Sequence, residues 1–202
     1  YGIDFLRNLK RDLDPDVDIS LHEKGYLVLA TDDGRDILRH NHATQTEFGG
    51  DIVWMEPDEL AAKYPWMTTS DLAAGCWGRT GEGWFDAYCL MQSFRKQARR
   101  RGADYIDGEV VEVLRDGDQI TGVVLKDGRR FGCGELVNAA GTGCSKLAKM
   151  AGLEIPVEPR KRCIFVFDCR DAADINASCP MLIDPSGLYV RPEGEFFITG
   201  IA

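Results

Sequence analysis

The sequence predicts an α+β fold, in which helices pack on sheets that are largely antiparallel. Two Asp-Gly dipeptides, Asp116-Gly117 and Asp127-Gly128, each separate two apolar runs, which is the strongest short-range signal for antiparallel hairpins. Residues 86–102 carry apolar side chains at helical spacing. Residues 155–202 contain several short apolar runs and no further helical pattern, so we expect strands to dominate the end of the chain.

The first third of the chain is expected to contain three helices and one strand. Helical spacing of apolar residues predicts the helices, and prolines and acidic residues near the helix starts mark their limits. The strand is a short apolar run. The helices are expected over residues 3–13, over residues 37–48, and from residue 56 to Pro65, and the strand over residues 25–30.

The middle of the chain predicts one amphipathic helix and a β-meander. Asp86 is the expected N-cap of the helix, and Gly102 is expected to end it. The apolar stripe of this helix comprises Ala87, Leu90, Met91, Phe94 and Ala98.

After the amphipathic helix, strands should predominate. The Asp-Gly turns divide the meander into three strands, and a further helix is expected to end at Gly152. The strands are expected over residues 109–115, 119–126, 129–138, 163–167, 187–191 and 196–200, and the helix over residues 144–151.

Composition narrows the possible partners. The 202 residues carry a net charge of -9, which argues against nucleic acid or an anionic membrane surface as the main partner. No apolar run approaches the roughly 20 residues needed to span a bilayer. Seven cysteines without a C-x-x-C pair and three poorly spaced histidines predict free thiols, no metal site and a cytoplasmic location.

The segment best suited to a ligand runs over residues 136–145. An apolar run leads into small residues and two glycines, and a predicted helix follows at once. Small residues let a backbone approach a ligand closely, and free N–H groups at a helix start favour a phosphate. A tight turn that needs glycine for its own geometry explains the same pattern, so both interpretations stay open.

A nicotinamide interpretation of this segment is the weaker alternative. Gly141-Thr142-Gly143 resembles the opening of a G-x-G-x-x-G nucleotide motif, and Asp168 could serve as the ribose-binding acid. However, Lys146 occupies the third glycine position, where its side chain would obstruct close packing of helix on strand. The chain also ends before a βαβαβ half of an NAD(P)-binding Rossmann fold is complete.

Several strings in fixed order point to one family of proteins. They are E-G-W-F-D at residues 82–86, the amphipathic helix, E-V-V-E-V at 109–113, V-N-A-A-G at 137–141 and P-V-E-P-R-K-R at 156–162. In this order and spacing, the chain resembles the D-amino-acid oxidase superfamily of flavoenzymes, which includes glycine oxidase, sarcosine oxidase and dimethylglycine dehydrogenase. The first and last strings are most similar to the branch of FAD-dependent oxidoreductase domain-containing proteins.

The resemblance implies the architecture and the cofactor. It implies a partial Rossmann-like FAD domain with an inserted β-meander, and a substrate domain built on an antiparallel sheet. Residues 1–16 and 70–153 would belong to the FAD domain, and residues 17–69 and 154–202 to the substrate domain. FAD would be the cofactor, with Val111, Ala139, Ala140, Gly141 and Thr142 beside it.

Two departures from the family pattern accompany the resemblance. Gly143 stands where the family usually has a tryptophan, so the bend should be looser. The glycine-rich N-terminal motif and the C-terminal flavin segment of the family are not in this sequence, which starts at Tyr1 and ends in an apolar run. We therefore expect an internal piece of a longer protein, inactive by itself.

The resemblance also implies the chemistry. In such enzymes an amine or amino acid gives hydride to the flavin, while protein groups hold the substrate. Strand alternation places Tyr189 and Arg191 on one face, so Tyr189 is expected to hydrogen-bond the substrate and Arg191 to bind its carboxylate. Arg162 is a further candidate for substrate binding.

Two alternatives to this chemistry stay open. The polar face of the strand with Tyr189 and Arg191 could simply lie in water. The parent protein could also keep the fold and act as a non-catalytic binding or assembly module, a reading that the glycine at position 143 favours slightly.

Overall fold

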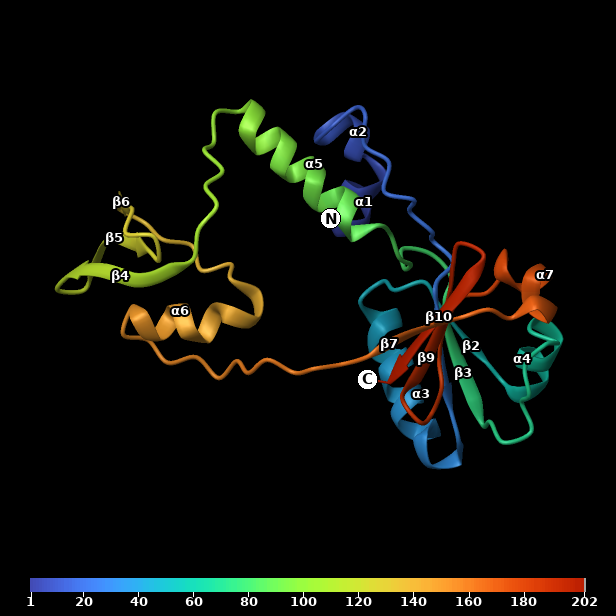
Figure 1. Ribbon diagram of the computed structural model, residues 1–202. Helices are drawn as coiled ribbons and strands as arrows, with labels where there is room; N and C mark the ends of the chain where they lie inside the picture. Colours follow the sequence, from blue (N-terminus) through green and yellow to red (C-terminus); the bar gives the residue numbers. More distant parts are fainter. Residues whose placement is uncertain (202) are drawn as a thin grey trace. The chain divides into compact units, whose positions relative to one another are not determined.

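A computed structural model describes residues 1–201 and divides the chain into two compact units (Figure 1). The first unit combines Tyr1–Arg101 with Arg162–Ala202, and the second is Gly102–Lys161. The α+β fold class predicted from the sequence is confirmed, because helices accompany a mixed sheet in the first unit and an antiparallel sheet in the second.

The first unit is built on a seven-stranded sheet with the order β2-β3-β1-β8-β9-β10-β7. All neighbouring strands are antiparallel except β1 and β8, which are parallel. The strands are β1 (Tyr26–Ala30), β2 (Ile52–Met55), β3 (Ala74–Gly78), β7 (Ile164–Phe167), β8 (Met181–Ile183), β9 (Leu188–Glu193) and β10 (Phe196–Ile201).

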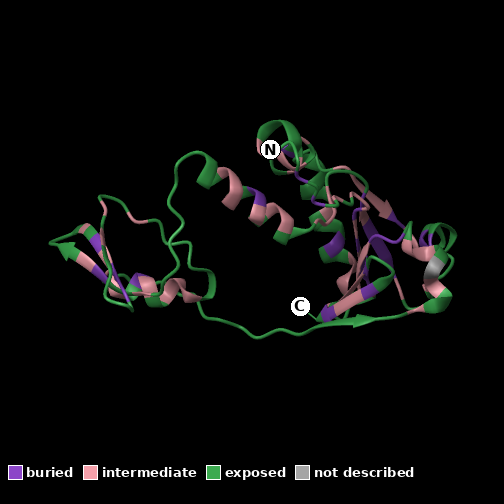
Figure 2. Cartoon of the chain, turned by 45° about the horizontal axis from the view of Figure 1, so that its top comes forward, coloured by how far each residue is buried: buried purple, intermediate pink, exposed green. Residues whose placement is uncertain are grey.

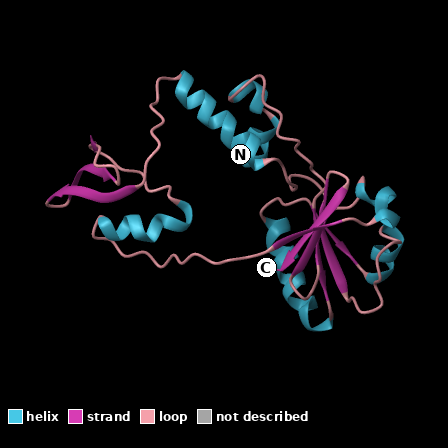
Figure 3. Cartoon of the chain, in the orientation of Figure 1, coloured by secondary structure: helices cyan, strands magenta, loops and turns pink. Residues whose placement is uncertain are grey.

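Helices lie on both sides of this sheet (Figure 3). The predicted helix at residues 3–13 is present but broken at Asn8, and the helix predicted at 37–48 begins earlier, after the extended residue Thr31. The helices of this unit are α1 (Gly2–Arg7), α2 (Leu9–Asp12), α3 (Asp32–Glu47), α4 (Pro57–Lys63), α5 (Ala87–Arg100) and α7 (Ala173–Asn176), with a 3-10 turn at Arg170–Ala172.

Two helices begin at the residues where the sequence predicts a helix start, and both starts carry capping contacts. Glu56 and Glu59 form a reciprocal capping box at α4, with Pro57 in the first turn. The Asp86 carboxylate accepts a hydrogen bond from the Cys89 backbone N–H at 2.9 Å, so Asp86 is the N-cap of α5, as predicted.

Half of the sheet is covered on both faces. On one face Leu27, Leu60 and Tyr64 pack together under α4. On the other face Leu38 of α3 packs on Cys76. Buried residues therefore gather in these strands (Figure 2).

The N-terminal segment and α5 form a third cluster. Leu9 of α2 is buried there, and Leu90 of α5 is partly buried against the cluster. The Lys96 ammonium lies 2.9 Å from the carboxylate of the fully buried Asp14, so α5 is tied to this segment by an ion pair as well. The predicted apolar stripe of α5 is only partly covered, because Met91 and Phe94 stay largely exposed.

The other half of the sheet has one open face. The pairing register places Tyr189 of β9 beside Gly200 of β10, and Gly200 beside Ile164 of β7. All four residues of the edge strand β7 are exposed, although all four are apolar. The apolar side chains of β7 are thus unpacked, whereas Tyr189 and Arg191 on β9 are half-buried.

The second unit is a three-stranded meander with one helix. The Asp-Gly hairpins are confirmed: β4 pairs with β5 and β5 with β6, all antiparallel. The elements are β4 (Val110–Asp116), β5 (Gln119–Leu125), β6 (Arg130–Gly132), a 3-10 turn at Gly141–Gly143 and α6 (Cys144–Met150).

Two features differ from the predicted strands. The third meander strand was expected over residues 129–138, but it ends at Gly132. The Cys133 N–H still donates to the Thr121 carbonyl oxygen of β5 at 3.1 Å, and residues 134–140 pair with no strand among the described residues. Conversely, β2, β3 and β8 were not predicted, since they are short runs that become strands through pairing with their neighbours. The division into an FAD domain and a substrate domain is a separate question and stays a prediction.

Candidate functional site

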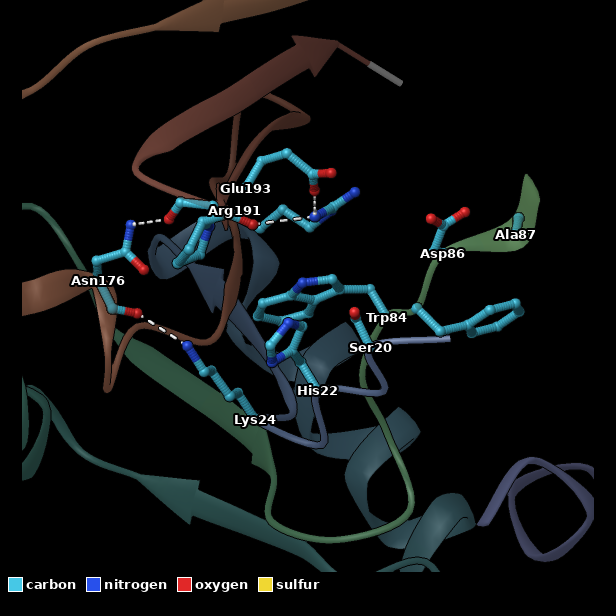
Figure 4. A pocket seen from close by; sticks show the side chains of 12 residues that line it. Ser20, His22, Lys24, Trp84, Asp86, Ala87, Asn176, Arg191 and Glu193 are labelled. Carbon is cyan, nitrogen blue, oxygen red and sulfur yellow. Dashed lines mark hydrogen bonds and ion pairs between the residues drawn. The ribbon is translucent and has the colours of Figure 1, made fainter. Parts of the chain in front are cut away.

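The first unit contains a polar cavity of about 590 Å³ at the end of β9 (Figure 4). Its walls come from the segment before β1, from the loop before α5, from Asn176 at the end of α7 and from the end of β9. The aromatic and ionisable side chains that line it are His22, Lys24, Trp84, Phe85, Asp86, Arg191 and Glu193.

Close backbone contacts bring Trp84 into this cavity. Its backbone N–H donates to the His22 carbonyl oxygen at 3.1 Å, and the His22 N–H donates to the Trp84 carbonyl oxygen at 2.9 Å. A Cβ on Gly83 would lie 1.9 Å from the His22 carbonyl oxygen, so only glycine allows this approach. Glycine in the E-G-W-F-D string therefore has a structural reason.

Two cations lie beside the Trp84 ring. The Arg191 guanidinium carbon is 5.3 Å from the ring centre, and the Lys24 ammonium nitrogen is 5.7 Å from it. The His22 ring lies 5.8 Å from the same indole, and Figure 4 shows Trp84 between Arg191 and His22. Two cations and one imidazole therefore surround one aromatic ring in a cavity that Asp86 and Glu193 also line.

The two cations differ in their partners. Arg191 forms an ion pair with Glu193 and donates through Nη1 to the Pro192 carbonyl oxygen at 2.9 Å. Lys24 donates to the Asn176 carbonyl oxygen at 2.9 Å, and burial lowers the pKa of its ammonium group.

Tyr189 lies on the same sheet face as Arg191, two residues along β9, but it does not line the cavity. Its ring leans across β10: a Cβ on Gly200 would be 2.8 Å from the Tyr189 hydroxyl oxygen. The Thr199 hydroxyl donates to the Tyr189 carbonyl oxygen at 2.7 Å. Gly200 thus leaves the space in which the phenol lies.

Arg162 lies just before β7 and is exposed. Its Nη1 donates to the Ile201 carbonyl oxygen at 3.3 Å, which ties the start of β7 to the end of β10. Its role in substrate binding stays a prediction.

The positions predicted beside the cofactor all belong to the second unit. Val111 falls at a register shift between Val110 and Glu112, so it is the extra residue of a β-bulge and takes no place in the ladder. A Lys146–Glu109 ion pair of 3.2 Å links α6 to the residue before β4.

The bend at residues 139–142 is open. Ala139, Ala140, Gly141 and Thr142 are all exposed, and no atom lies within 4 Å of a Cβ built on Gly141. Gly141 has a φ of 54°, in the region that favours glycine. Because the bend is exposed and built of small residues, it leaves room for an extended ligand such as FAD.

A concave surface adjoins this bend. The Asn138 side-chain amide bridges the bend, since it donates to the Cys144 carbonyl oxygen at 2.8 Å. Asn138 and Cys144 line a cavity of about 680 Å³ together with Leu147 and Arg115. The residues of this unit therefore fit a cofactor lying along the bend.

In the described part of the chain, no three or more His, Cys, Asp or Glu residues are grouped so that they could hold a metal ion. All seven cysteines are free thiols. Across residues 1–201, no helix has both the length and the apolar character required to cross a membrane.

The sequence alone did not indicate three cavity residues, Lys24, His22 and Trp84, as a group. The signal in the sequence is the pair of glycines beside them, Gly25 and Gly83, because glycine is typical of positions where two backbone segments approach closely. Gly25 has a φ of 78°, and a Cβ there would lie 1.8 Å from a carbonyl oxygen of β3.

Comparison with known proteins gives consistent results. The family described as DAO, FAD dependent oxidoreductase, matches residues 1–201. FAD-dependent oxidoreductase domain-containing protein 1 of Xenopus laevis is 33% identical over 227 residues, covering 96% of this chain and 45% of that protein. The chain thus spans about half the length of the curated relatives it matches.

Solved structures share the fold. L-proline dehydrogenase from P. horikoshii matches with a TM-score of 0.84 and 24% identity, over 100% of this chain and 53% of that one. Glycine oxidase from Geobacillus kaustophilus matches with a TM-score of 0.83 and 22% identity, over 100% and 54%. With the family match over nearly every residue, these findings establish that the chain belongs to the DAO family of FAD-dependent oxidoreductases.

Proposed function

We propose that the protein containing this chain oxidises the C–N bond of a small amine or amino acid, with FAD as the hydride acceptor. The observation that carries the proposal is the arrangement on β9, where Tyr189 and Arg191 share the open sheet face and Arg191 lines a cavity. Relatives of the same fold, named glycine oxidase and L-proline dehydrogenase, support an amino-acid substrate.

Arg191 is suited to bind the substrate carboxylate. A guanidinium has five N–H donors, and both hydrogens of Nη1 are used by Pro192 and Glu193. The edge formed by Nε and Nη2 is left for a two-point contact with a carboxylate. Tyr189 offers its hydroxyl on the same face, and Arg162 is a further substrate contact in this proposal.

The bend and the bulge of the second unit would hold the cofactor. We assign Val111, Ala139, Ala140, Gly141 and Thr142 to this role, because they are exposed and present backbone groups or small side chains. FAD, when bound, supplies the acceptor for the hydride. The chain by itself should bind FAD weakly and be inactive, because no G-x-G-x-x-G motif occurs in it.

Two predictions from the sequence belong to the same proposal. Residues 1–16 and 70–153 would serve the FAD domain, and residues 17–69 and 154–202 the substrate domain. A cytoplasmic location is proposed from the free cysteines, which suit a reducing compartment.

The test uses the whole protein with its flavin. Under anaerobic conditions, amino acids and secondary amines are mixed with it, and loss of the oxidised flavin absorbance is followed. We expect reduction of the flavin by at least one of them. Arg191→Lys should raise the substrate concentration needed for half-maximal flavin reduction by about tenfold or more, since the two-point contact is lost. A protein that does not bind FAD would refute the proposal.

One observation favours a second candidate function. Gly143 replaces the usual tryptophan of the family pattern, which is compatible with a non-catalytic binding or assembly module. The same experiment separates the two. A protein that binds FAD, and whose flavin no amine reduces, would support the module.

A further inference from the structure

We propose that the cavity beside Trp84 binds a second carboxylate of the substrate, and that Lys24 is the group that binds it. The substrate class would then be an amine with two carboxylates, one held by Arg191 and the other by Lys24. This inference rests on the proposed function for the role of Arg191, and it adds a residue and a substrate class to it.

The first observation is that Lys24 has no carboxylate partner. The chain has 33 acidic and 24 basic residues, so most cations can find an acid. Of the residues that the structure describes, none gives the Lys24 ammonium an ion pair. The ammonium donates to the Asn176 carbonyl oxygen at 2.9 Å, lies over the Trp84 ring and interacts with the Cys179 thiol. An ammonium group has three N–H donors, so two are left to face the cavity.

The second observation is that the nearby acids are engaged elsewhere. Glu193 pairs with Arg191, and the Asp86 carboxylate accepts hydrogen bonds from Cys89 at the start of α5. Neither acid therefore neutralises Lys24. A partly buried cation without a counter-ion is costly, and a carboxylate from a ligand would relieve that cost.

The third observation is the sheet register. Tyr26 of β1 pairs with Met181 of β8, which stands next to Leu182, the partner of Val190 on β9. The start of β1 therefore lies level with the end of β9, two strand positions across. Lys24 precedes β1, so it borders the cavity from the β1 side, with β8 between it and Arg191.

The spacing suits a small dicarboxylic amine. The Arg191 guanidinium carbon and the Lys24 nitrogen lie 5.3 Å and 5.7 Å from one ring centre, so they cannot be farther apart than the sum of these distances. A short chain with a hydrogen-bonded carboxylate at each end can span that gap. The cavity of about 590 Å³ has room for such a molecule.

The test measures binding and flavin reduction separately in the whole protein. Iminodiacetate is the probe, and sarcosine is its matched control, because it has the same N-substituted glycine without the second carboxylate. Binding is followed by the fluorescence of Trp84, with Trp84→Phe identifying its contribution. We expect iminodiacetate to bind at least about tenfold more tightly than sarcosine, as a charge-assisted hydrogen bond provides.

Variants of Lys24 decide the assignment. Lys24→Met should remove the preference for iminodiacetate, and Lys24→Arg should keep most of it. Lys63→Met is the matched control, because Lys63 also lies over an indole, 4.0 Å from the Trp77 ring centre, but outside the cavity. Thermal unfolding of each variant shows whether loss of the Asn176 contact has disturbed the fold. If Lys24→Met is unfolded, the preference of Lys24→Arg for iminodiacetate is compared with that of the unchanged protein instead.

The possible results are distinct. Equal binding of the two probes, or a preference that survives Lys24→Met in a folded protein, would overturn the inference. If iminodiacetate binds through Lys24 but no amine reduces the flavin, the proposed oxidation fails while the dicarboxylate site stands. If sarcosine reduces the flavin as readily as iminodiacetate and binds as tightly, the oxidation stands and the dicarboxylate site fails.

Discussion

The two halves of the seven-stranded sheet are organised differently. In the half formed by β1, β2 and β3, α3 packs on one face and α4 on the other, and side chains such as Leu27 are fully buried. In the half formed by β7, β9 and β10, the face that carries Tyr189 and Arg191 is not covered by a helix of its own unit, and β7 is exposed along its whole length. Burial is therefore concentrated in the first half, whereas the second half carries the residues that we propose to contact the substrate.

This division has a physical reason. A side chain that must contact a ligand cannot be packed under a helix, so an active face gives up the apolar burial that stabilises a sheet. The covered half provides this burial. The hydrogen-bonded pairing of β1 with β8 joins the open half to it in one continuous sheet. Substitutions should accordingly affect stability in one half and binding in the other.

The largest effect is expected for Leu27→Ala in the covered half. Leu27 is 0% exposed between α4 and the sheet, so its removal should leave a cavity and lower the free energy of unfolding by about 2–5 kcal/mol. Urea denaturation measures this. Leu188→Ala in β9 is the matched control, because Leu188 is 39% exposed, and it should cost less than about 1 kcal/mol. Equal losses would contradict the division.

The next effect concerns pH. Burial raises the pKa of the Cys76 thiol, which lies under α3, to about 11. Because the folded state holds this proton more tightly than the unfolded state, the stabilisation is complete below the unfolded pKa, near 9, and is lost as pH rises towards 11. The loss should be about 2–3 kcal/mol for this group.

The Cys76 contribution can be isolated by substitution. Unfolding free energies at pH 8 and pH 10.5 should differ less in Cys76→Ala than in the unchanged protein. A second buried thiol, Cys179, has its pKa raised to about 11 by burial as well and stays in both proteins, so the difference belongs to Cys76. Identical pH profiles would show that the thiol is not buried as described.

A smaller effect is expected at Gly200 in the open half. An alanine there would bring its Cβ within 2.8 Å of the Tyr189 hydroxyl oxygen and displace the ring. In the whole protein we expect flavin reduction by a substrate to slow about tenfold, since small misplacements of a substrate-contacting group are costly. In a Tyr189→Ala background, Gly200→Ala should cause no further slowing of flavin reduction. If it still slows reduction there, Gly200 does not act through Tyr189.

Elements with strong local signals could be predicted from the sequence. The Asp-Gly turns specify the meander, the Glu56–Glu59 capping box specifies α4, and Asp86 specifies α5. In contrast, β3 has the sequence Ala-Gly-Cys-Trp-Gly and becomes a strand only because β1 and β2 pair with it on both sides. Residues 134–140 give the opposite case, since the apolar run within them remains irregular where no strand pairs with it.

The candidate site shows the same limit. Alternation along β9 is local, so the shared face of Tyr189 and Arg191 could be predicted. The meeting of Lys24 with Trp84 could not, because it depends on the backbone bridge between His22 and Trp84 and on the absence of a side chain at Gly83. Such contacts are tertiary and leave no periodic pattern in the sequence.

The smallest effect on stability is expected at the edge strand β7. Val166 is 64% exposed, so Val166→Lys should change the free energy of unfolding by no more than about 0.5 kcal/mol. The same change should lower aggregation of the isolated chain, because lysine on an apolar edge strand hinders pairing with a second sheet. Light scattering at rising protein concentration measures this.

The matched control for Val166 is a buried valine in an otherwise largely exposed strand. Val113 of β4 is 7% exposed, and Val113→Lys should unfold the meander because an unpaired charge would be buried there. If Val166→Lys is as disruptive as Val113→Lys, then β7 is covered in solution and the open face is smaller than its exposure indicates. If it only suppresses aggregation, the apolar edge is free in the isolated chain, and the unpacked side of the sheet extends from Tyr189 to β7.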